Sequence, residues 1–224
     1  MSFIVAIDGP AGSGKGTIAK KISKELGLVN LDTGATYRCV ALKSIKENVP
    51  LSDEKGIIKL LDDIHIQFEI SEPTDTVILN GKDVTKDIRT KEVTNIVSQI
   101  SSIKEVRFKM VDIQRKMAEG KNVVMEGRDI GTYVFPNANV KIYLDANLEE
   151  RAKRRYKENM EKGINTTYEE VVQNLKLRDE NDKAKEIGAL KIAEDAIVID
   201  STKLSIEQVV EKVKNIIKEK MGEI

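Results

Sequence analysis

The sequence contains very little cysteine and histidine. Cys39 and His65 are the only residues of their kinds among the 224, which excludes an internal disulfide, a cysteine-rich zinc site and a metal site with two histidines. We expect Cys39 in the core and His65 exposed. No apolar run approaches the ~20 residues that span a membrane, and the run at residues 3–7 stops at Asp8, which argues against a signal peptide. We therefore expect a cytoplasmic protein that does not contact membranes.

The sequence also lacks an excess of either charge. Its 37 Lys and Arg residues balance 37 Asp and Glu residues, whereas proteins that bind nucleic acid usually carry a basic excess for the phosphates. Hydrophobic residues make up 40% of the chain, which is enough to build a folded core. We expect one large domain, or a core with inserted subdomains, and no nucleic-acid partner.

Short apolar runs alternate with amphipathic stretches along most of the chain. The runs are rich in Val and Ile and lie at residues 3–7, 28–31 (the weakest), 123–125, 140–144 and 196–199. Such runs are typical of strands that are buried on both faces of a parallel sheet. Helical spacing of apolar residues is found at 18–26, 103–117 and 206–217. The alternation predicts an open α/β sheet with ligands beyond the carboxyl ends of its strands.

Two regions depart from this alternation. Between residues 64 and 84, apolar and polar residues alternate, a turn is expected at residues 71–74, and Asn80-Gly81 is a strong hairpin signal. This predicts a small antiparallel unit. Residues 148–186 contain ten basic and ten acidic residues, which predicts two exposed helices joined around Gly163. Because few apolar residues would anchor these helices, we expect them to be mobile.

A phosphate-binding pattern follows the first apolar run. Its nine residues are Gly9, Pro10, Ala11, Gly12, Ser13, Gly14, Lys15, Gly16 and Thr17. Glycines allow the backbone to aim N–H groups at one point, the helix N-terminus adds its dipole, and Lys15 adds a full charge, which suits the β- and γ-phosphates of a nucleoside triphosphate. The pattern departs from the usual one at Gly16, where Ser or Thr normally follows the lysine. A glycine-rich turn with an exposed lysine is the alternative.

This pattern predicts nucleotide binding but does not identify the reaction. A regulatory GTPase would need an Asn-Lys-x-Asp motif to read guanine, and the sequence contains none. A nucleotide-binding module without enzymatic activity stays possible. Two features favour a phosphotransferase: the glycine that follows the lysine, and the arginines that lie near the strand ends.

Polar residues near two strand ends are candidates for binding the acceptor. Thr33 either caps a helix or contacts a ligand, and Arg38 either lies on the surface or holds a phosphate. After the strand at 122–125, Glu126 could organise Mg²⁺ and its water, Arg128 could neutralise phosphoryl oxygens, and Asp129 could accept a hydrogen bond from a substrate amine or hydroxyl. A salt bridge within this turn is the alternative.

In the charged segment, four residues are spaced so that pairs of them share a helix face. Arg151 and Arg155 are four residues apart, and so are Arg178 and Asp182. The simpler interpretation, which we favour for most charges here, is a solvated helix surface with local salt bridges.

Taken together, these residues resemble those of the bacterial cytidylate kinases, a family of nucleoside monophosphate kinases. The resemblance covers almost the full length. It rests on the motifs at residues 9–17, 32–38 (Asp-Thr-Gly-Ala-Thr-Tyr-Arg), 80–90, 126–132 (Glu-Gly-Arg-Asp-Ile-Gly-Thr), 134–138 and 178–182. It implies the α/β fold of a P-loop kinase, with a five-stranded parallel core sheet, an inserted monophosphate-binding domain that carries a small antiparallel sheet, and a helical lid.

The resemblance also implies domain limits. The core would comprise residues 1–38, 107–147 and 188–224, the monophosphate-binding domain 39–106 with its small β insert near 64–84, and the lid 148–187. The implied reaction moves the γ-phosphoryl group of ATP to CMP or dCMP, with Mg²⁺ as cofactor, in a protein expected to be a monomer. A kinase for another small acceptor, or a non-enzymatic nucleotide-dependent switch, is the alternative.

Roles for individual residues follow from the resemblance. Residues 9–17 would bind ATP, Lys15 and Arg128 would be catalytic, Thr17 and Glu126 would hold Mg²⁺ through water, and the lid would contribute Arg151 and Arg155. The implied CMP contacts are Thr33, Arg38, Ser98, Arg107, Arg128, Asp129, Arg178 and Asp182.

Within this set, Ser98, Arg107 and Asp129 would read the cytosine edge, and Arg178 with Asp182 would hold the ribose. The chain departs from the family where a further arginine is usual, because it has Lys185 there. A lysine cannot clamp a phosphate bidentately, so we leave Lys185 out of the catalytic set.

Overall fold

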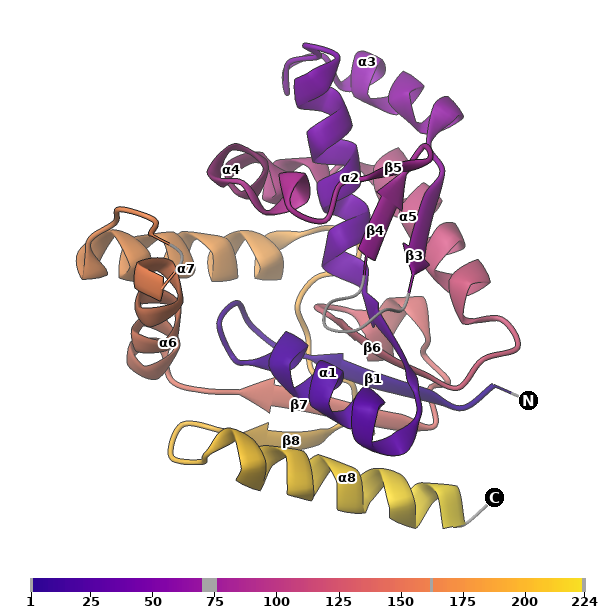
Figure 1. Ribbon diagram of the computed structural model, residues 1–224, viewed down its shortest axis with the longest axis vertical. Helices are drawn as coiled ribbons and strands as arrows, with labels where there is room; N and C mark the ends of the chain where they lie inside the picture. Colours follow the sequence, from indigo (N-terminus) through magenta and orange to yellow (C-terminus); the bar gives the residue numbers. More distant parts are fainter. Residues whose placement is uncertain (1, 70–75, 162, 223–224) are drawn as a thin grey trace. The chain divides into compact units, whose positions relative to one another are not determined.

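The computed structural model describes residues 2–69, 76–161 and 163–222 (Figure 1). The chain forms two compact units, Met1–Asn30 with Lys121–Ile224, and Leu31–Gly120. The division into core, monophosphate-binding domain and lid stays a prediction. None of the helices in the described part of the chain is long and apolar enough to cross a membrane.

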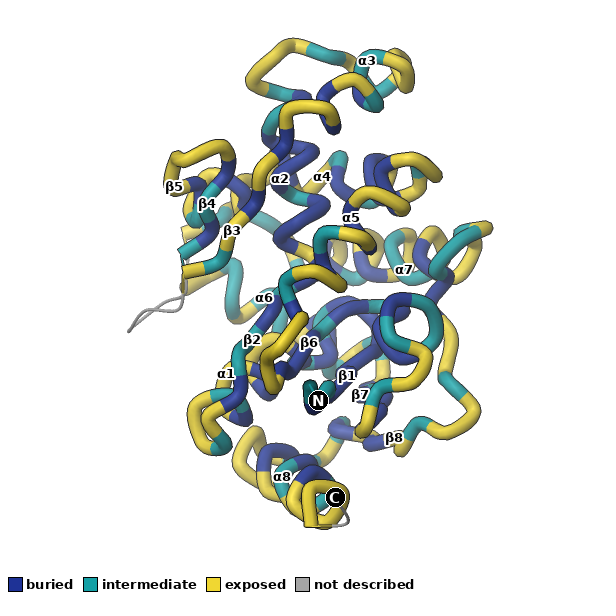
Figure 2. Tube along the Cα trace, turned by 90° about the vertical axis from the view of Figure 1, so that its right-hand side faces the viewer, coloured by how far each residue is buried: buried dark blue, intermediate teal, exposed yellow. Residues whose placement is uncertain are grey.

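A five-stranded sheet has the strand order β2-β6-β1-β7-β8. The strands are β1 (Ile4–Asp8), β2 (Val29–Asp32), β6 (Val123–Gly127), β7 (Val140–Asp145) and β8 (Ile197–Asp200). β1 pairs in parallel with β6 and with β7, and β7 pairs in parallel with β8. β1 and β7 are buried along almost their whole length (Figure 2). All five apolar runs are therefore strands, and the predicted α/β fold with a parallel sheet is confirmed.

Two amphipathic helices of the first unit share one hydrophobic cluster with the sheet. Ile18 and Ile22 of α1 (Lys15–Leu26) and Val213 and Ile217 of α8 (Ile206–Gly222) are buried in it. α1 ends at Gly27, which has φ +67 and donates its N–H to the carbonyl of Ser23, a conformation that favours glycine. The chain runs from the end of β1 through the loop at residues 9–14 directly into the N-terminus of α1.

The charged segment forms α6 (Leu148–Glu161) and α7 (Tyr168–Ala184), as expected. Thr167 and Glu170 cap the start of α7 reciprocally. The helices are better anchored than their composition suggested, because Ala152, Val171 and Leu175 form a buried cluster with Ala11 of the phosphate loop.

The second unit combines helices with a small antiparallel sheet. Its helical elements are α2 (Thr33–Lys46), α3 (Glu54–Lys59), η1 (Leu60–Asp63), η2 (Asp87–Arg89), α4 (Lys91–Ile100) and α5 (Lys104–Ala118). The strands β3 (Ile66–Glu69), β4 (Thr76–Leu79) and β5 (Lys82–Asp83) lie in the order β3-β4-β5. Asn80 (φ +49) and Gly81 (φ +76) form the tight β4–β5 turn, which confirms the hairpin. The turn expected at residues 71–74 lies outside the described residues.

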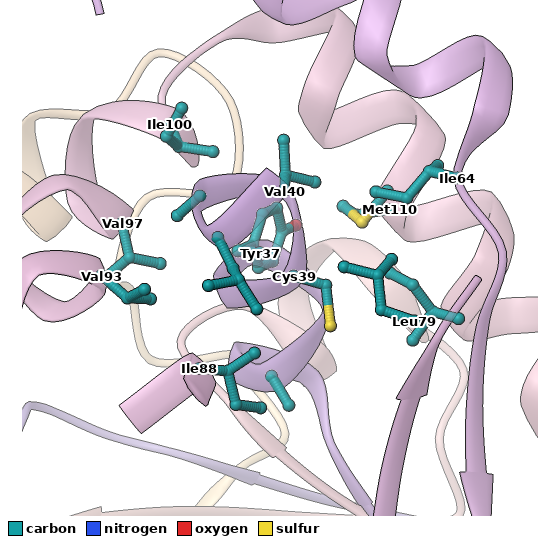
Figure 3. Close-up of a cluster of buried hydrophobic side chains, with 14 of the residues drawn as sticks. Tyr37, Cys39, Val40, Ile64, Leu79, Ile88, Val93, Val97, Ile100 and Met110 are labelled. Atoms are coloured by element: carbon teal, nitrogen blue, oxygen red, sulfur yellow. The ribbon is translucent and has the colours of Figure 1, made fainter. Parts of the chain in front are cut away.

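The core of the second unit is built around α2. In Figure 3, Tyr37, Cys39 and Val40 of α2 lie among apolar side chains that include Val97 of α4 and Met110 of α5. Cys39 is fully buried and His65 is exposed, so both expectations are confirmed.

Candidate active site

The loop between β1 and α1 has the geometry of a phosphate cradle. Gly9 (φ +151) passes so close to the carbonyl of Leu144 that any Cβ would collide with it. Gly14 (φ +95) is the N-cap of α1. Because it has no side chain, Gly14 cannot cap the first N–H groups of the helix as Ser or Asp would. Those donors, together with the helix dipole, suit an anion.

Lys15 is folded into this loop and is not an exposed surface lysine. Its side chain is buried, and Nζ donates to the carbonyl of Pro10 at 2.8 Å and to Ser13 Oγ at 3.4 Å. Burial and the charge of Arg128 together lower the pKa of Lys15 to about 7, although the charge of Glu126 opposes the shift. The alternative of an exposed lysine in a turn is therefore wrong.

The position of Glu126 explains why glycine follows Lys15. β6 lies beside β1 with Glu126 opposite Ile7, and a Cβ on Gly16 would lie only 2.8 Å from Glu126 Oε1. A serine or threonine at this position would therefore compete with the carboxylate for the same space. Thr17, one residue further on, is exposed.

Glu126 and Thr17 fit a Mg²⁺ ion that arrives with a nucleotide. Within residues 2–69, 76–161 and 163–222, no three His, Cys, Asp or Glu side chains form a group that could hold a metal. Mg²⁺ is usually bound by one or two carboxylates, substrate phosphates and water. A single carboxylate beside the phosphate loop is the donor set that such an ion requires.

Asp8, which we did not assign to the site from the sequence, lies next to Lys15 and is buried. Its carboxylate accepts hydrogen bonds from Ile130 N at 2.8 Å and Gly131 N at 2.7 Å. Burial raises the pKa of Asp8 to about 6 although these two donors lower it. The sequence carried a signal, because a carboxylate that ends a buried apolar strand directly before the phosphate loop requires a partner.

A buried group of charges joins α7 to the turn after β6. Asp182 accepts from Arg128 Nε at 2.8 Å and from Lys185 Nζ at 2.8 Å, and the Asp182 side chain is only 5% exposed. Burial by itself would raise the pKa of Asp182, but Arg128 and Lys185 outweigh it and hold the pKa well below its usual range. The interpretation as a solvated surface is wrong for Asp182, and Lys185 belongs to this group.

Arg151 of α6 is also buried and binds the phosphate loop. Its guanidinium donates to the carbonyls of Ala11 at 3.0 Å and Ala146 at 2.9 Å and to Asp179 Oδ2 at 2.7 Å. A solvated surface is therefore the wrong interpretation for Arg151 as well.

The second arginine that reaches the loop is Arg154, which the sequence analysis missed. It donates to the carbonyl of Ser13 at 3.4 Å and to the carbonyl of Ser201 at 2.7 Å. Arg155, which was expected to act with Arg151, instead contacts Glu158 at 3.0 Å. Arg151 and Arg154 lie three residues apart on the face of α6 that is turned to the loop, and this spacing could have suggested Arg154.

Two predicted CMP contacts lie near the start of α2 in the second unit. Thr33 is buried, and the N-cap is Asp32, whose Oδ1 accepts from Ala35 N at 3.1 Å. The alternative in which Thr33 caps the helix is therefore wrong. Arg38 is half-buried and donates to the carbonyl of Ile88 at 3.0 Å and to Thr94 Oγ1 at 2.9 Å.

The other two predicted contacts of the second unit are more buried than their sequence positions suggested. Arg107 is 3% exposed, and its guanidinium lies 5.5 Å from the centre of the Tyr37 ring. The buried hydroxyl oxygen of Ser98 has no hydrogen-bond partner among the described residues. A buried polar atom without a partner costs stability, and a ligand can supply the partner.

The first unit brings most of the predicted residues to one place. The charges of Glu126, Arg128 and Arg178 all act on Lys15. Asp129 follows Arg128 and is buried.

A cavity of about 640 Å³ opens where β7 and β8 end. It is lined by Asp145, Ala146, Asn147, Asp200, Thr202, Lys203, Leu204 and Lys212. Thr33, Arg38, Ser98 and Arg107 belong to the second unit.

A family model described as cytidylate kinase matches residues 5–219. A cytidylate kinase of Caldicellulosiruptor bescii is 49% identical over 209 residues, which is 93% of this chain and 92% of the relative. A cytidylate kinase of Geobacillus sp. (strain WCH70) is 48% identical over 218 residues, 97% of each chain. A crystal structure of an uncharacterized protein from Eubacterium ventriosum ATCC 27560 has a TM-score of 0.54 at 13% identity, covers 98% of this chain and 99% of its own, and is similar in fold alone.

Proposed function

We infer that this chain, which belongs to the cytidylate kinase family, is an ATP-dependent phosphotransferase that converts CMP to CDP. The observation that carries this function is the phosphate loop at the N-terminus of α1, where the charges of Arg128 and Glu126 act on the buried Lys15. Phosphoryl transfer needs little covalent chemistry from the protein, and catalysis comes mainly from positioning and charge stabilisation.

On the ATP side, we assign the triphosphate to residues 9–17, with Lys15 and Arg128 as the catalytic cations. The nucleoside of ATP would occupy the cavity between the ends of β7 and β8, because ligands of open α/β sheets bind beyond the carboxyl ends of the strands. Mg²⁺ would be held by Glu126 and Thr17 through water, and it supplies charge neutralisation of the phosphates. The two arginines that reach the loop from α6, Arg151 and Arg154, would hold the helix pair over the nucleotide.

On the acceptor side, we assign the CMP phosphate to Arg38 and Arg128, and we propose Thr33 as a further CMP contact. Arg178 and Asp182 would hold the ribose. Burial of Asp182 supports this assignment, because a buried, fully ionised carboxylate can accept hydrogen bonds from hydroxyl groups. dCMP, which lacks one of these hydroxyls, is proposed as a second substrate.

The cytosine edge is assigned to Ser98, Arg107 and Asp129. Cytosine presents an amino donor where uracil presents a carbonyl. Asp129 and Ser98 can both accept a hydrogen bond from the amino group, whereas the carboxylate of Asp129 would face the lone pairs of the carbonyl in UMP. Sites built on such hydrogen bonds can discriminate by ~10⁴ or more, whereas apolar shape gives only ~10–200-fold. The hydroxyl of Ser98, buried and unsatisfied among the described residues, supports this role. A strong preference for CMP over UMP is therefore expected.

One assay separates this proposal from its alternatives. ADP production is measured with MgATP and, in turn, CMP, dCMP, UMP, AMP or no acceptor. We expect rapid turnover with CMP and dCMP and almost none without an acceptor. Turnover only with a different acceptor would instead indicate another small-molecule kinase, and binding of ATP without turnover on any acceptor would indicate a switch.

The reading role of Asp129 is tested by Asp129→Ala. We expect the ratio of kcat/KM for CMP to that for UMP to fall by at least ~10²-fold. Asp53→Asn, which changes the exposed N-cap of α3, serves as a control and should leave the ratio unchanged. An unchanged ratio in Asp129→Ala would remove this residue from cytosine recognition. A monomeric state, a cytoplasmic location, and no nucleic-acid or membrane partner stay predictions.

A further inference from the structure

The proposed reaction gives no role to Asp8, a buried carboxylate of the first unit. Asp8 ends β1, immediately before the phosphate loop, and is 5% exposed. Both carboxylate oxygens accept hydrogen bonds from backbone N–H groups of the turn after β6, Oδ1 from Ile130 and Oδ2 from Gly131.

The turn held by Asp8 is the one that presents Arg128 and Asp129. It leads into η3 (Ile130–Val134), a single helical turn whose N-cap is Asp129. The carbonyl of Asp129 accepts from Tyr133 N at 2.8 Å and from Val134 N at 3.1 Å. The backbone of Asp129 is therefore held on one side by η3, and the next two N–H groups are held by Asp8.

Burying a charged carboxylate at this position costs free energy of folding. Burial, helped by the neighbouring charge of Asp129, raises the pKa of Asp8 to about 6, although the two N–H donors and Lys15 oppose the rise. An apolar strand end would avoid this cost. Fixing the geometry of a functional turn through a supporting hydrogen-bond network is a recognised use of such groups.

Gly131 lies in a crowded place between the side chains of Lys141 and Asp8. A Cβ on Gly131 would lie 3.4 Å from Asp8 Oδ2, 3.0 Å from Lys141 Cδ and 3.2 Å from Lys141 Cγ. Lys141 cannot easily move, because Nζ is bound to Asp195 at 2.8 Å. A methyl group at Gly131 would therefore force either the Lys141 side chain or the backbone of this turn to shift.

We propose that Asp8 is a positioning residue for pyrimidine recognition: by binding the N–H groups of Ile130 and Gly131, it fixes where Asp129 meets the base of the acceptor nucleotide. This inference rests on the proposed function. It assigns Asp8 to the acceptor side of the site, although in sequence it adjoins the ATP side. Both of these hydrogen bonds go to the turn after β6 and not to the phosphate loop, so the loss of Asp8 should affect KM for ATP less than KM for CMP.

The test is Asp8→Asn, which keeps the shape but replaces one of the two acceptors by an NH₂ group. We expect KM for CMP to rise by about tenfold or more, the CMP/UMP ratio of kcat/KM to fall by a similar factor, and KM for ATP to stay within about threefold. Asp53→Asn, which removes the same charge from an exposed helix cap, is the matched control.

A double variant distinguishes positioning from general damage. If Asp8 acts through Asp129, then Asp8→Asn introduced into Asp129→Ala should leave the CMP/UMP ratio where Asp129→Ala alone puts it. A further fall of the same size in that background would overturn the proposal, and so would an unchanged ratio in the single variant.

Gly131→Ala perturbs the same contact without removing the charge, and it decides the matter if Asp8→Asn does not fold. We expect a lower CMP/UMP ratio with little change in KM for ATP, and a wild-type ratio would overturn the proposal. A wild-type protein with no activity on CMP would overturn this inference together with the proposed function. A wild-type protein that prefers CMP, with variants that keep the preference, would overturn this inference alone.

Discussion

Binding of ATP should weaken as the pH rises above neutrality, because Lys15 then loses its proton before the nucleotide arrives. Burial and the charge of Arg128 lower the pKa of Lys15 to about 7 in the nucleotide-free loop. The triphosphate should bind the protonated form, since its negative charges restore the pKa toward the ordinary value of about 10.4. Above pH 7, each binding event should therefore take up a proton.

The size of the effect follows from the fraction of the protein that is protonated beforehand. With a pKa of about 7, that fraction is roughly one half at pH 7 and roughly one hundredth at pH 9. Because the apparent Kd is the intrinsic value divided by this fraction, it should rise about 50-fold between the two pH values. The terminal phosphate, whose pKa is near ~6, is ionised over this whole range and adds little.

Calorimetric titration with MgATP alone measures both quantities. The titration is run between pH 6.5 and 9 in two buffers that differ in ionisation enthalpy, which counts the protons taken up. Lys15→Arg is the matched control, because a guanidinium stays charged and should make the profile nearly flat. A wild-type Kd that changes less than about threefold from pH 7 to 9, with no proton uptake, would refute the reasoning.

Two further substitutions test the buried charges. Asp182→Asn leaves Arg128 and Lys185 without the carboxylate that they share. We therefore expect the free energy of unfolding in urea to fall by about 3 kcal/mol. An unchanged urea midpoint would show that the ion pairs of Asp182 contribute little to stability. Gly16→Ala places a methyl group 2.8 Å from Glu126 Oε1, so the carboxylate must move and kcat with CMP should fall about tenfold or more. A wild-type kcat in Gly16→Ala, in a protein with an unchanged circular dichroism spectrum, would contradict this explanation of the glycine.

Most of the fold could be predicted from local patterns in the sequence. Val- and Ile-rich runs become strands of a parallel sheet because both faces are buried there, and helical spacing of apolar residues identified α1, α5 and α8. Asn80-Gly81 predicted the β4–β5 hairpin because both residues tolerate the left-handed conformation that its turn requires. These features depend on neighbours in the chain, so they can be recognised without knowing the tertiary structure.

The resemblance to the cytidylate kinases rested on motifs of the same local kind. The family match over residues 5–219 confirms it. The individual roles in CMP binding stay predictions, because they depend on where a substrate lies.

The partners of buried charges could not be predicted in this way. Asp182 and Arg151 have the local sequence of a solvated helix surface, and their burial depends on Arg128 and on the carbonyl of Ala11, which are 54 and 140 residues away in the chain. The site residues that sequence reasoning missed, Asp8 and Arg154, were missed for the same reason.

The sequence by itself thus determined the elements, the phosphate loop and the family, since each is encoded by residues close together in the chain. Only the tertiary structure decided which charges are desolvated and what holds them. Sheet register and helix packing bring residues far apart in sequence within hydrogen-bond distance, and a carboxylate has the same local pattern whether it meets water or, like Asp8, two buried N–H groups.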